Sequence, residues 1–192
     1  GNRISEEERL GTEALDGADV YLTVREPLQQ IMEDELAALA EQFAPKAAYA
    51  VMAEPSTGAI LAMAQCPTFD SNSRENMDPA HWRNRIVSDG FEPGSIMKSV
   101  AIAGAIDYGT ITLDDVFDCE RGYWMFARRP LRDCHPYEDL TVWEIVQKSS
   151  NIGTAKIAIK MGKNNLYQTF TRFGFGQATG IGLGEEATGI FR

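Results

Sequence analysis

Ser95 and Lys98 are the residues whose types and spacing point most directly to chemistry. They lie in the stretch 92–98, which reads EPGSIMK. Pro-Gly before an apolar run predicts that Ser95 begins a helix, where free backbone amides and the positive end of the helix dipole stabilise developing negative charge. Three-residue spacing places Lys98 on the same helical face. A lysine buried on an apolar helix can lose its charge and remove the proton of a serine nucleophile. An isolated pair of this kind also fits an N-cap serine and a lysine whose stem lies along apolar surface.

Ser149 and Asn151 form a second candidate pair, in the stretch 148–151 with the sequence KSSN. They flank a single residue between two expected helices, so a bend there would direct both side chains to one side of a cleft. Asparagine offers a donor and an acceptor that suit an amide substrate, and a serine hydroxyl can pass on a proton. The cluster also resembles an ordinary helix N-cap. Each motif alone is weak evidence for a catalytic site, whereas the two motifs together in this order are strong evidence for one.

The elements that must position these residues follow from periodicity and from turn residues. The sequence predicts a polar linker, a strand and an amphipathic helix, then a β-hairpin and a long loop, and finally helices around both motifs. A hairpin is also expected around Gly122 and the Arg128-Arg129-Pro130 corner, and a Thr-x-x-Glu capping box begins the helix before the second motif. The expected ranges are linker 1–18, strand 20–24, helix 26–43, strands 47–53 and 59–64, loop 66–91, helices 95–106, 141–147, 151–161 and 163–173, and a glycine-rich tail 174–189.

Composition excludes several classes of protein. The 192 residues are 44% hydrophobic and 24% charged, which is typical of a chain that buries a core. The net charge of −10 has the wrong sign for a protein that binds nucleic acid. No apolar stretch approaches the roughly 20 residues of a membrane helix. The three cysteines lack the spacing of a zinc site, so we expect neither metal nor cofactor.

The order of the motifs resembles one known family. SxxK followed by SxN is the pattern of serine penicillin-recognising enzymes, and from residue 19 onward the chain resembles the transpeptidase domain of class B penicillin-binding proteins. Arg25 departs from the aspartate that the family usually carries after its opening strand. The stretches that carry the resemblance outside the two motifs are 19–24, 28–29, 56–64, 67–70, 84–85, 91–94, 179–183 and 186–189.

The resemblance implies an incomplete fold. The expected class is α/β (α+β), a transpeptidase fold like that of penicillin-binding proteins and serine β-lactamases. We expect residues 1–18 to be a linker and residues 19–192 to hold the first strands of the central antiparallel sheet and the helical subdomain. The family's third motif, Lys-Thr/Ser-Gly, does not occur before Arg192. Its strand normally supplies one oxyanion donor, whose loss typically costs about 10²–10³ in rate, so we expect this chain to be weakly active or inactive.

The resemblance also implies an activity. Lys98 would deprotonate Ser95, which would attack the penultimate D-alanine of a peptidoglycan stem peptide, and an amine of a neighbouring stem would resolve the acyl-enzyme. Ser149 and Asn151 would assist catalysis and bind substrate. The implied partners are stem peptides, β-lactams and other cell-wall synthesis proteins. The implied location is the periplasmic side of the inner membrane, with anchorage by a transmembrane helix absent from this chain.

Other interpretations stay open at this point. A serine β-lactamase or β-lactam sensor shares SxxK but matches the flanking stretches less well, and a non-catalytic scaffold could keep the fold. Cys119 and Cys134 flank the expected hairpin in a family that works outside the cytoplasm, so a disulfide or two free thiols both fit; a bridge would contribute roughly 3 kcal/mol. Asp133 and His135 are interpreted as residues of a polar surface loop.

Overall fold

The chain forms two compact units. A computed structural model of the protein describes residues 17–73, 78–184 and 186–191. Contacts between residues divide it into unit 1, residues 1–86, and unit 2, residues 87–192, which are described separately below. The linker predicted for residues 1–18 lies almost entirely outside the described residues. Its boundary, and the assignment of residues 19–192 to one partial domain, stay predictions.

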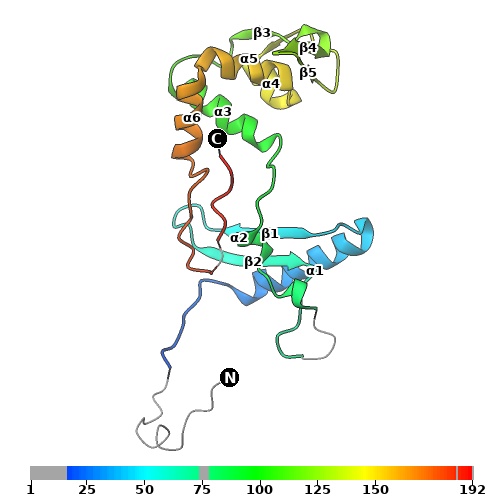
Figure 1. Cartoon of the computed structure of the whole chain (residues 1–192), viewed down its shortest axis with the longest axis vertical. Coiled ribbons are helices and arrows are strands. Elements are labelled where there is room, and N and C mark those ends of the chain that lie inside the picture. The colour runs from blue at the N-terminus through cyan, green and yellow to red at the C-terminus, as the bar shows by residue number, and fades with distance from the viewer. Residues whose placement is uncertain (1–16, 74–77, 185, 192) are drawn as a thin grey trace, which may run out of the picture. The chain divides into compact units, whose positions relative to one another are not determined.

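Unit 1 is a helix packed on a two-stranded antiparallel sheet (Figure 1). The helix α1 covers Glu26–Phe43 as predicted, with a proline in its first turn and Ala44 in the left-handed conformation at its end. The strands β1 (Ala48–Ala53) and β2 (Ile60–Cys66) form the predicted hairpin. The side-chain amide of Gln29 joins helix to sheet, because it accepts from the amide of Met63 (2.8 Å) and donates to its carbonyl (2.9 Å). The short helices η1 (Pro79–His81) and α2 (Arg85–Ser88) follow, α2 ending beyond the unit boundary.

The strand predicted over residues 20–24 is wrong. These residues are extended without pairing as a strand, and Tyr21 is 91% exposed. The segment reaches β2 through the Thr23 hydroxyl, which donates to the carbonyl of Ile60 (2.5 Å), and next to it the Arg25 amide donates to Leu61 (2.8 Å). The β-branched and aromatic composition indicated strand propensity correctly. A high β-propensity does not by itself provide a neighbouring strand with which the segment can pair.

Unit 2 combines helices with two small antiparallel sheets. Strand β3 pairs with β6, and β4 pairs with β5. The expected hairpin exists: it turns at Ala127 and Arg128, where the predicted Arg128-Arg129-Pro130 corner begins, and Gly122 precedes its first strand. The predicted helices agree with the structure to within one residue at each end, and the capping box of Thr141 and Glu144 is present. The elements are α3 (Ile96–Asp107), β3 (Val116–Asp118), η2 (Glu120–Gly122), β4 (Tyr123–Phe126), β5 (Arg129–Arg132), β6 (Asp139–Thr141), α4 (Val142–Lys148), α5 (Asn151–Met161) and α6 (Lys163–Arg172).

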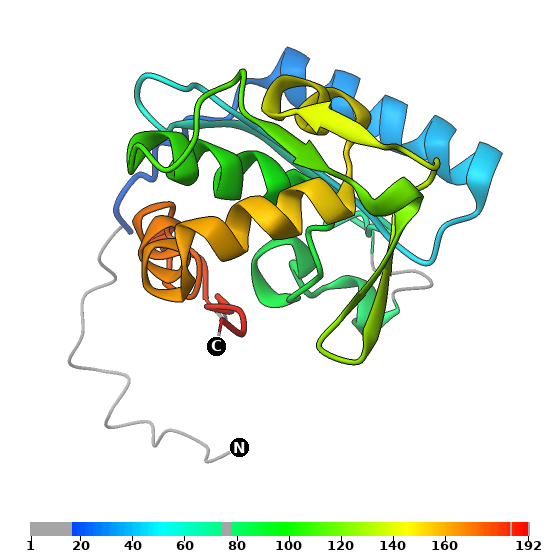
Figure 2. The ribbon, with the colours of Figure 1, turned by 90° about the horizontal axis from the view of Figure 1, so that it is seen from above.

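One apolar core fixes the helices that carry both motifs. Side chains from α3, α4 and α5 meet in it, and Figure 2 shows α5 beside α3. Gly153 allows α4 to approach α5 closely, because a Cβ atom there would lie 2.6 Å from the side chain of Ile145. The helix ends that bear the candidate residues are therefore held by packing. The buried members of the core are Ile102, Ala105, Ile111, Cys119, Leu140, Val142, Ile145, Ile157 and Met161.

Candidate active site

Ser95 stands at the N-cap of α3, as predicted. Gly94 precedes it with a φ of +64°, a left-handed conformation that glycine adopts without strain and that turns the chain into the helix. Ser95 itself has helical backbone angles, and its side chain makes no capping hydrogen bond. It is also exposed. The capping role that a serine at this position usually has is absent, so its hydroxyl remains free to react.

Lys98 reaches the second motif. Its ammonium group donates to the carbonyl of Ser149 (2.5 Å) and to the Ser149 hydroxyl (2.9 Å). Burial lowers the pKa of Lys98, while electrostatic interactions with Asp133 and Cys134 act in the opposite direction. Lowering the pKa brings the neutral amine, the form that can accept a proton, closer to physiological pH.

Ser149 and Ser150 form the tight connection between α4 and α5. Ser149 is a non-glycine residue with a left-handed backbone (φ 54°, ψ 44°), a strained conformation of the kind that concentrates at functional sites. Ser150 is 1% exposed, and its hydroxyl accepts from the amide of Gly153 (2.9 Å) as the cap of α5. The two neighbours thus differ: Ser150 holds the helix, and Ser149 presents its hydroxyl to Lys98.

Asp133 is the site residue that the sequence analysis missed. Its carboxylate accepts from the Ser150 hydroxyl (2.6 Å) and from the amides of Asn151 and Ile152 at the start of α5. Asp133 does lie in a loop, as the sequence predicted, between β5 and β6, but it is half-buried there and its bonds to α5 were not predicted. No local pattern could have found it, because it lies 17 residues before Ser150 and reaches α5 only through the fold.

Asn151 is exposed and attached to the end of β5. Its side-chain Nδ2 donates to the carbonyl of Arg132 (2.6 Å), which leaves Oδ1 for other partners. The structure thus joins Lys98 to Ser149 and Asn151 to Arg132. The backbone amide of Lys98 donates to the carbonyl of Ser95 (3.1 Å), one helical turn earlier, but within the described ranges no hydrogen bond joins the side chains of these two residues. The described part of the chain also contains no group of three metal-ligating side chains.

Of the two states that the sequence left open for Cys119 and Cys134, the structure has free thiols and no disulfide. Both residues are free thiols, as is Cys66. Cys119 is fully buried, where its sulfur contacts the Ser150 hydroxyl (3.5 Å) and burial raises the pKa of its thiol. Cys134 is exposed, with its sulfur 4.0 Å from the Tyr137 hydroxyl. One side chain faces the core and the other the surface, so flanking the same hairpin did not bring the sulfurs together.

The family follows from a comparison with known proteins. The model of the family described as "Penicillin binding protein transpeptidase domain" matches residues 48–192. The chain belongs to this family. Both serine motifs and the helices that carry them lie inside the matched residues.

Two of the curated relatives are peptidoglycan D,D-transpeptidases by name. The probable D,D-transpeptidase PenA of Neisseria gonorrhoeae is 34% identical over 176 residues, which cover 92% of this chain and 30% of PenA. The D,D-transpeptidase FtsI of Escherichia coli strain K12 is 30% identical over 199 aligned residues, which cover 100% of this chain and 34% of FtsI. The chain thus spans about a third of the length of these relatives.

Solved structures agree with the predicted fold. A peptidoglycan glycosyltransferase from Burkholderia ambifaria superposes with a TM-score of 0.80 at 34% identity, over 90% of this chain and 50% of the other. The transpeptidase domain of penicillin-binding protein 3 from Burkholderia pseudomallei gives 0.79 at 32% identity, over 89% and 47%. The prediction of a partial penicillin-binding transpeptidase fold is confirmed.

Proposed function

We propose that this chain carries the nucleophile of a peptidoglycan D,D-transpeptidase, with Ser95 as nucleophile and Lys98 as general base. One observation carries the proposal: in a chain of this family, the uncapped hydroxyl of Ser95 begins the helix that also bears Lys98, and hydrogen bonds to Ser149 hold the amine of this half-buried lysine in the site. Membership of the family supports the reaction class, and the environment of Ser95 supports its role.

The acyl transfer follows from these positions. The neutral amine of Lys98 takes the proton of Ser95 Oγ, and this oxygen bonds to the carbonyl carbon of the penultimate D-alanine. The amide of Ser95 at the start of α3 stabilises the oxyanion. The bond to the terminal D-alanine nitrogen then breaks, and that nitrogen takes a proton from Ser149 Oγ, which Lys98 replaces across their 2.9 Å hydrogen bond. An amine of a second stem peptide attacks the ester and releases Ser95.

Asn151 has the substrate-binding role in this proposal. Because Nδ2 is held by the carbonyl of Arg132, the side-chain amide is fixed in orientation, and Oδ1 can accept from a backbone amide of the stem peptide. Asp133 acts through the others, because it fixes the backbone of Asn151 and the hydroxyl of Ser150. It is a positioning residue.

The partners and the location are part of the same proposal. Stem peptides ending in D-alanyl-D-alanine are the substrates, β-lactams acylate Ser95, and other cell-wall synthesis proteins act with the parent protein on the periplasmic side. The names of PenA and FtsI support the substrate class. Among the described residues no helix is both long and apolar enough to cross a bilayer.

Labelling with a fluorescent penicillin tests the proposal. We expect one covalent label per chain that accumulates with time and penicillin concentration. The label should be lost in Ser95→Ala and kept in Ser99→Ala, a matched change of an exposed serine on the same helix. Absence of label in the unmodified chain, or retention in Ser95→Ala, would overturn the proposal. Rapid hydrolysis of a chromogenic cephalosporin would instead identify a β-lactamase.

A further inference from the structure

Residues 121–132 form a cationic and aromatic hairpin, called here the arginine hairpin. It consists of β4, β5, the turn of two residues between them and the two residues before β4. It contains four arginines and no acidic residue, in a chain whose net charge is −10. In Figure 2 the hairpin extends away from the helices of unit 2. Charge of one sign is therefore concentrated on an element that solvent reaches.

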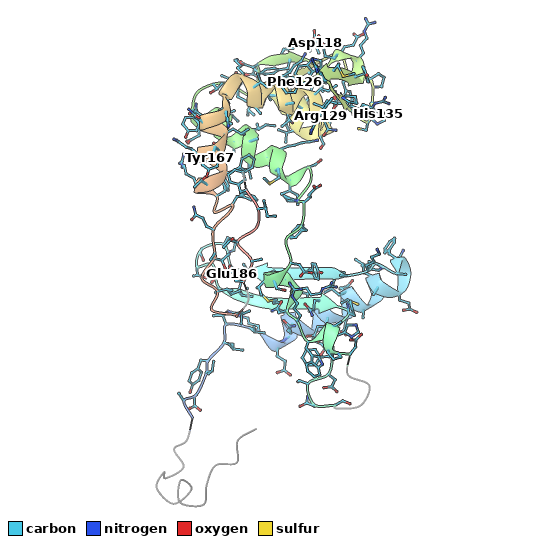
Figure 3. The ribbon with its side chains drawn as sticks, viewed as in Figure 1. Asp118, Phe126, Arg129, His135, Tyr167 and Glu186 are labelled. Carbon is cyan, nitrogen blue, oxygen red and sulfur yellow. The ribbon has the colours of Figure 1, made fainter. Side chains whose placement is uncertain are left out.

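Two of the four guanidinium groups already have partners. Arg121 pairs with Glu138 (3.3 Å), and Arg132 lies over the ring of Tyr123, 5.2 Å from its centroid. Arg128 and Arg129 are exposed, and within the described residues their side chains have neither an ion pair nor a hydrogen bond. Figure 3 labels Arg129 beside the hairpin end. The two unpaired cations are neighbours at the tip.

The turn holds these cations next to aromatic side chains. Ala127 and Arg128 have φ values of +48° and +65°, although hairpin turns of this type favour glycine and asparagine. The register pairs Phe126 with Arg129, so an aromatic ring and a guanidinium group are adjacent across the strands. Phe126 is 46% exposed. Strained backbone at this tip maintains an exposed pair of cations with a ring beside them.

The base of the hairpin belongs to the candidate active site. The carbonyl of Arg132 holds Asn151, and the next residue, Asp133, holds the start of α5. A ligand that lies along the hairpin therefore ends beside Asn151. A ligand of the arginine hairpin must therefore be an extended molecule that carries negative charge and reaches into the candidate active site.

We propose that the arginine hairpin binds the side-chain carboxylates of the peptidoglycan strand whose stem peptide enters the site. The inference rests on the proposed function. Guanidinium groups match carboxylates with two parallel hydrogen bonds, and stem peptides carry free carboxylates at regular intervals along a strand. The negative charge of the whole chain repels a polyanion, so the hairpin is the element on which such a strand can approach.

The test measures binding without turnover. Soluble, uncross-linked peptidoglycan strands are titrated against the unmodified chain, the double variant Arg128→Gln/Arg129→Gln, and the matched control Lys46→Gln/Lys163→Gln, which removes the same charge from two other exposed positions. We expect the arginine variant to bind about tenfold more weakly and the control to bind like the unmodified chain. Arg128→Lys/Arg129→Lys should recover part of the affinity, because the charge returns without the planar fork.

Two further arms identify the ligand chemistry. Strands with amidated carboxylates should bind as weakly to the unmodified chain as native strands bind to the arginine variant. If the arginine variant and the unmodified chain bound native strands equally, the inference would be overturned. It would also be overturned if the unmodified chain bound vesicles of phosphatidylcholine and phosphatidylglycerol through the hairpin but did not bind strands. Acylation of the unmodified chain is measured separately. Acylation without hairpin-dependent strand binding therefore refutes only the inference, and strand binding without acylation refutes only the proposed function.

Discussion

Ser95 and Ser150 are the N-cap residues of two helices in unit 2, α3 and α5, but their hydroxyl groups make different contacts. The Ser150 hydroxyl is buried, donates to Asp133 and accepts from Gly153. The Ser95 hydroxyl is exposed and caps nothing. Both positions follow from the same local rule, that serine favours helix starts. The hydrogen bonds separate them into a structural serine and a free one.

The difference has an energetic side. A buried serine that satisfies a carboxylate and a helix amide contributes to stability, whereas a solvated serine without partners contributes little. Replacing Ser150 should therefore affect unfolding, and replacing Ser95 should affect reactivity. Each of the following changes tests one side of this contrast.

Ser95→Ala should have the largest effect on reactivity. We expect the rate of acylation by penicillin to fall by at least about 10³-fold, because no other hydroxyl begins the helix that bears Lys98. The free energy of unfolding should change by less than about 0.5 kcal/mol, because no capping bond is lost. Acylation kinetics and urea titrations measure the two effects. A large loss of stability would show that the serine is structural.

Lys98→Ala should lower the acylation rate by roughly 10²–10⁴-fold, the usual contribution of a general base. In the unmodified chain the rate should rise with pH, since only the neutral amine accepts the proton. Burial lowers the pKa of Lys98, so the midpoint of this rise should lie below 10.5, the ordinary lysine value. A rate that does not change with pH would exclude Lys98 as the base.

Asp133→Asn should affect stability and the pH profile together. Hydrogen bonds to a charged group are lost at the start of α5, so the free energy of unfolding should fall by about 2–3 kcal/mol. The negative charge of Asp133 raises the pKa of Lys98, so its removal should move the acylation profile to lower pH. Asp139→Asn removes the same charge from β6 and should leave the profile in place. An unmoved profile in Asp133→Asn would reduce its role to capping.

Ser150→Ala should have the smallest effect on reactivity. The cap of α5 and one partner of Asp133 are lost, so we expect a destabilisation of about 1–2 kcal/mol by urea titration. Well below the unfolding transition, acylation should stay within a few-fold of the unmodified rate. If this variant lost acylation as completely as Ser95→Ala, the division between the two serines would not hold.

The features that the sequence predicted correctly depend on residues that are close together along the chain. Helix α1 was predicted at its observed bounds because its apolar spacing and Pro45 are local signals, and the capping box of Thr141 and Glu144 acts within one turn. Ser95 was placed at a helix start for the same reason. These features need no knowledge of distant partners.

The features that the sequence did not predict depend on contacts between residues that are far apart along the chain. Residues 20–24 have strand propensity but do not pair with β2 as a strand, and only the Thr23 hydroxyl is hydrogen-bonded to it among the described residues. Cys119 and Cys134 differ in burial, which spacing does not encode. Asp133 reaches α5 through the connection between β5 and β6. Partners far apart in sequence emerge only when the chain is folded.

Locating the acyl group tests the central claim most directly. The chain is incubated with penicillin, digested, and each serine-containing peptide is sequenced by tandem mass spectrometry. The account predicts the mass of one ring-opened penicillin on Ser95 and unmodified Ser149 and Ser150. An adduct on Ser149 or Ser150, or an unmodified Ser95 after prolonged incubation at high penicillin concentration, would contradict it.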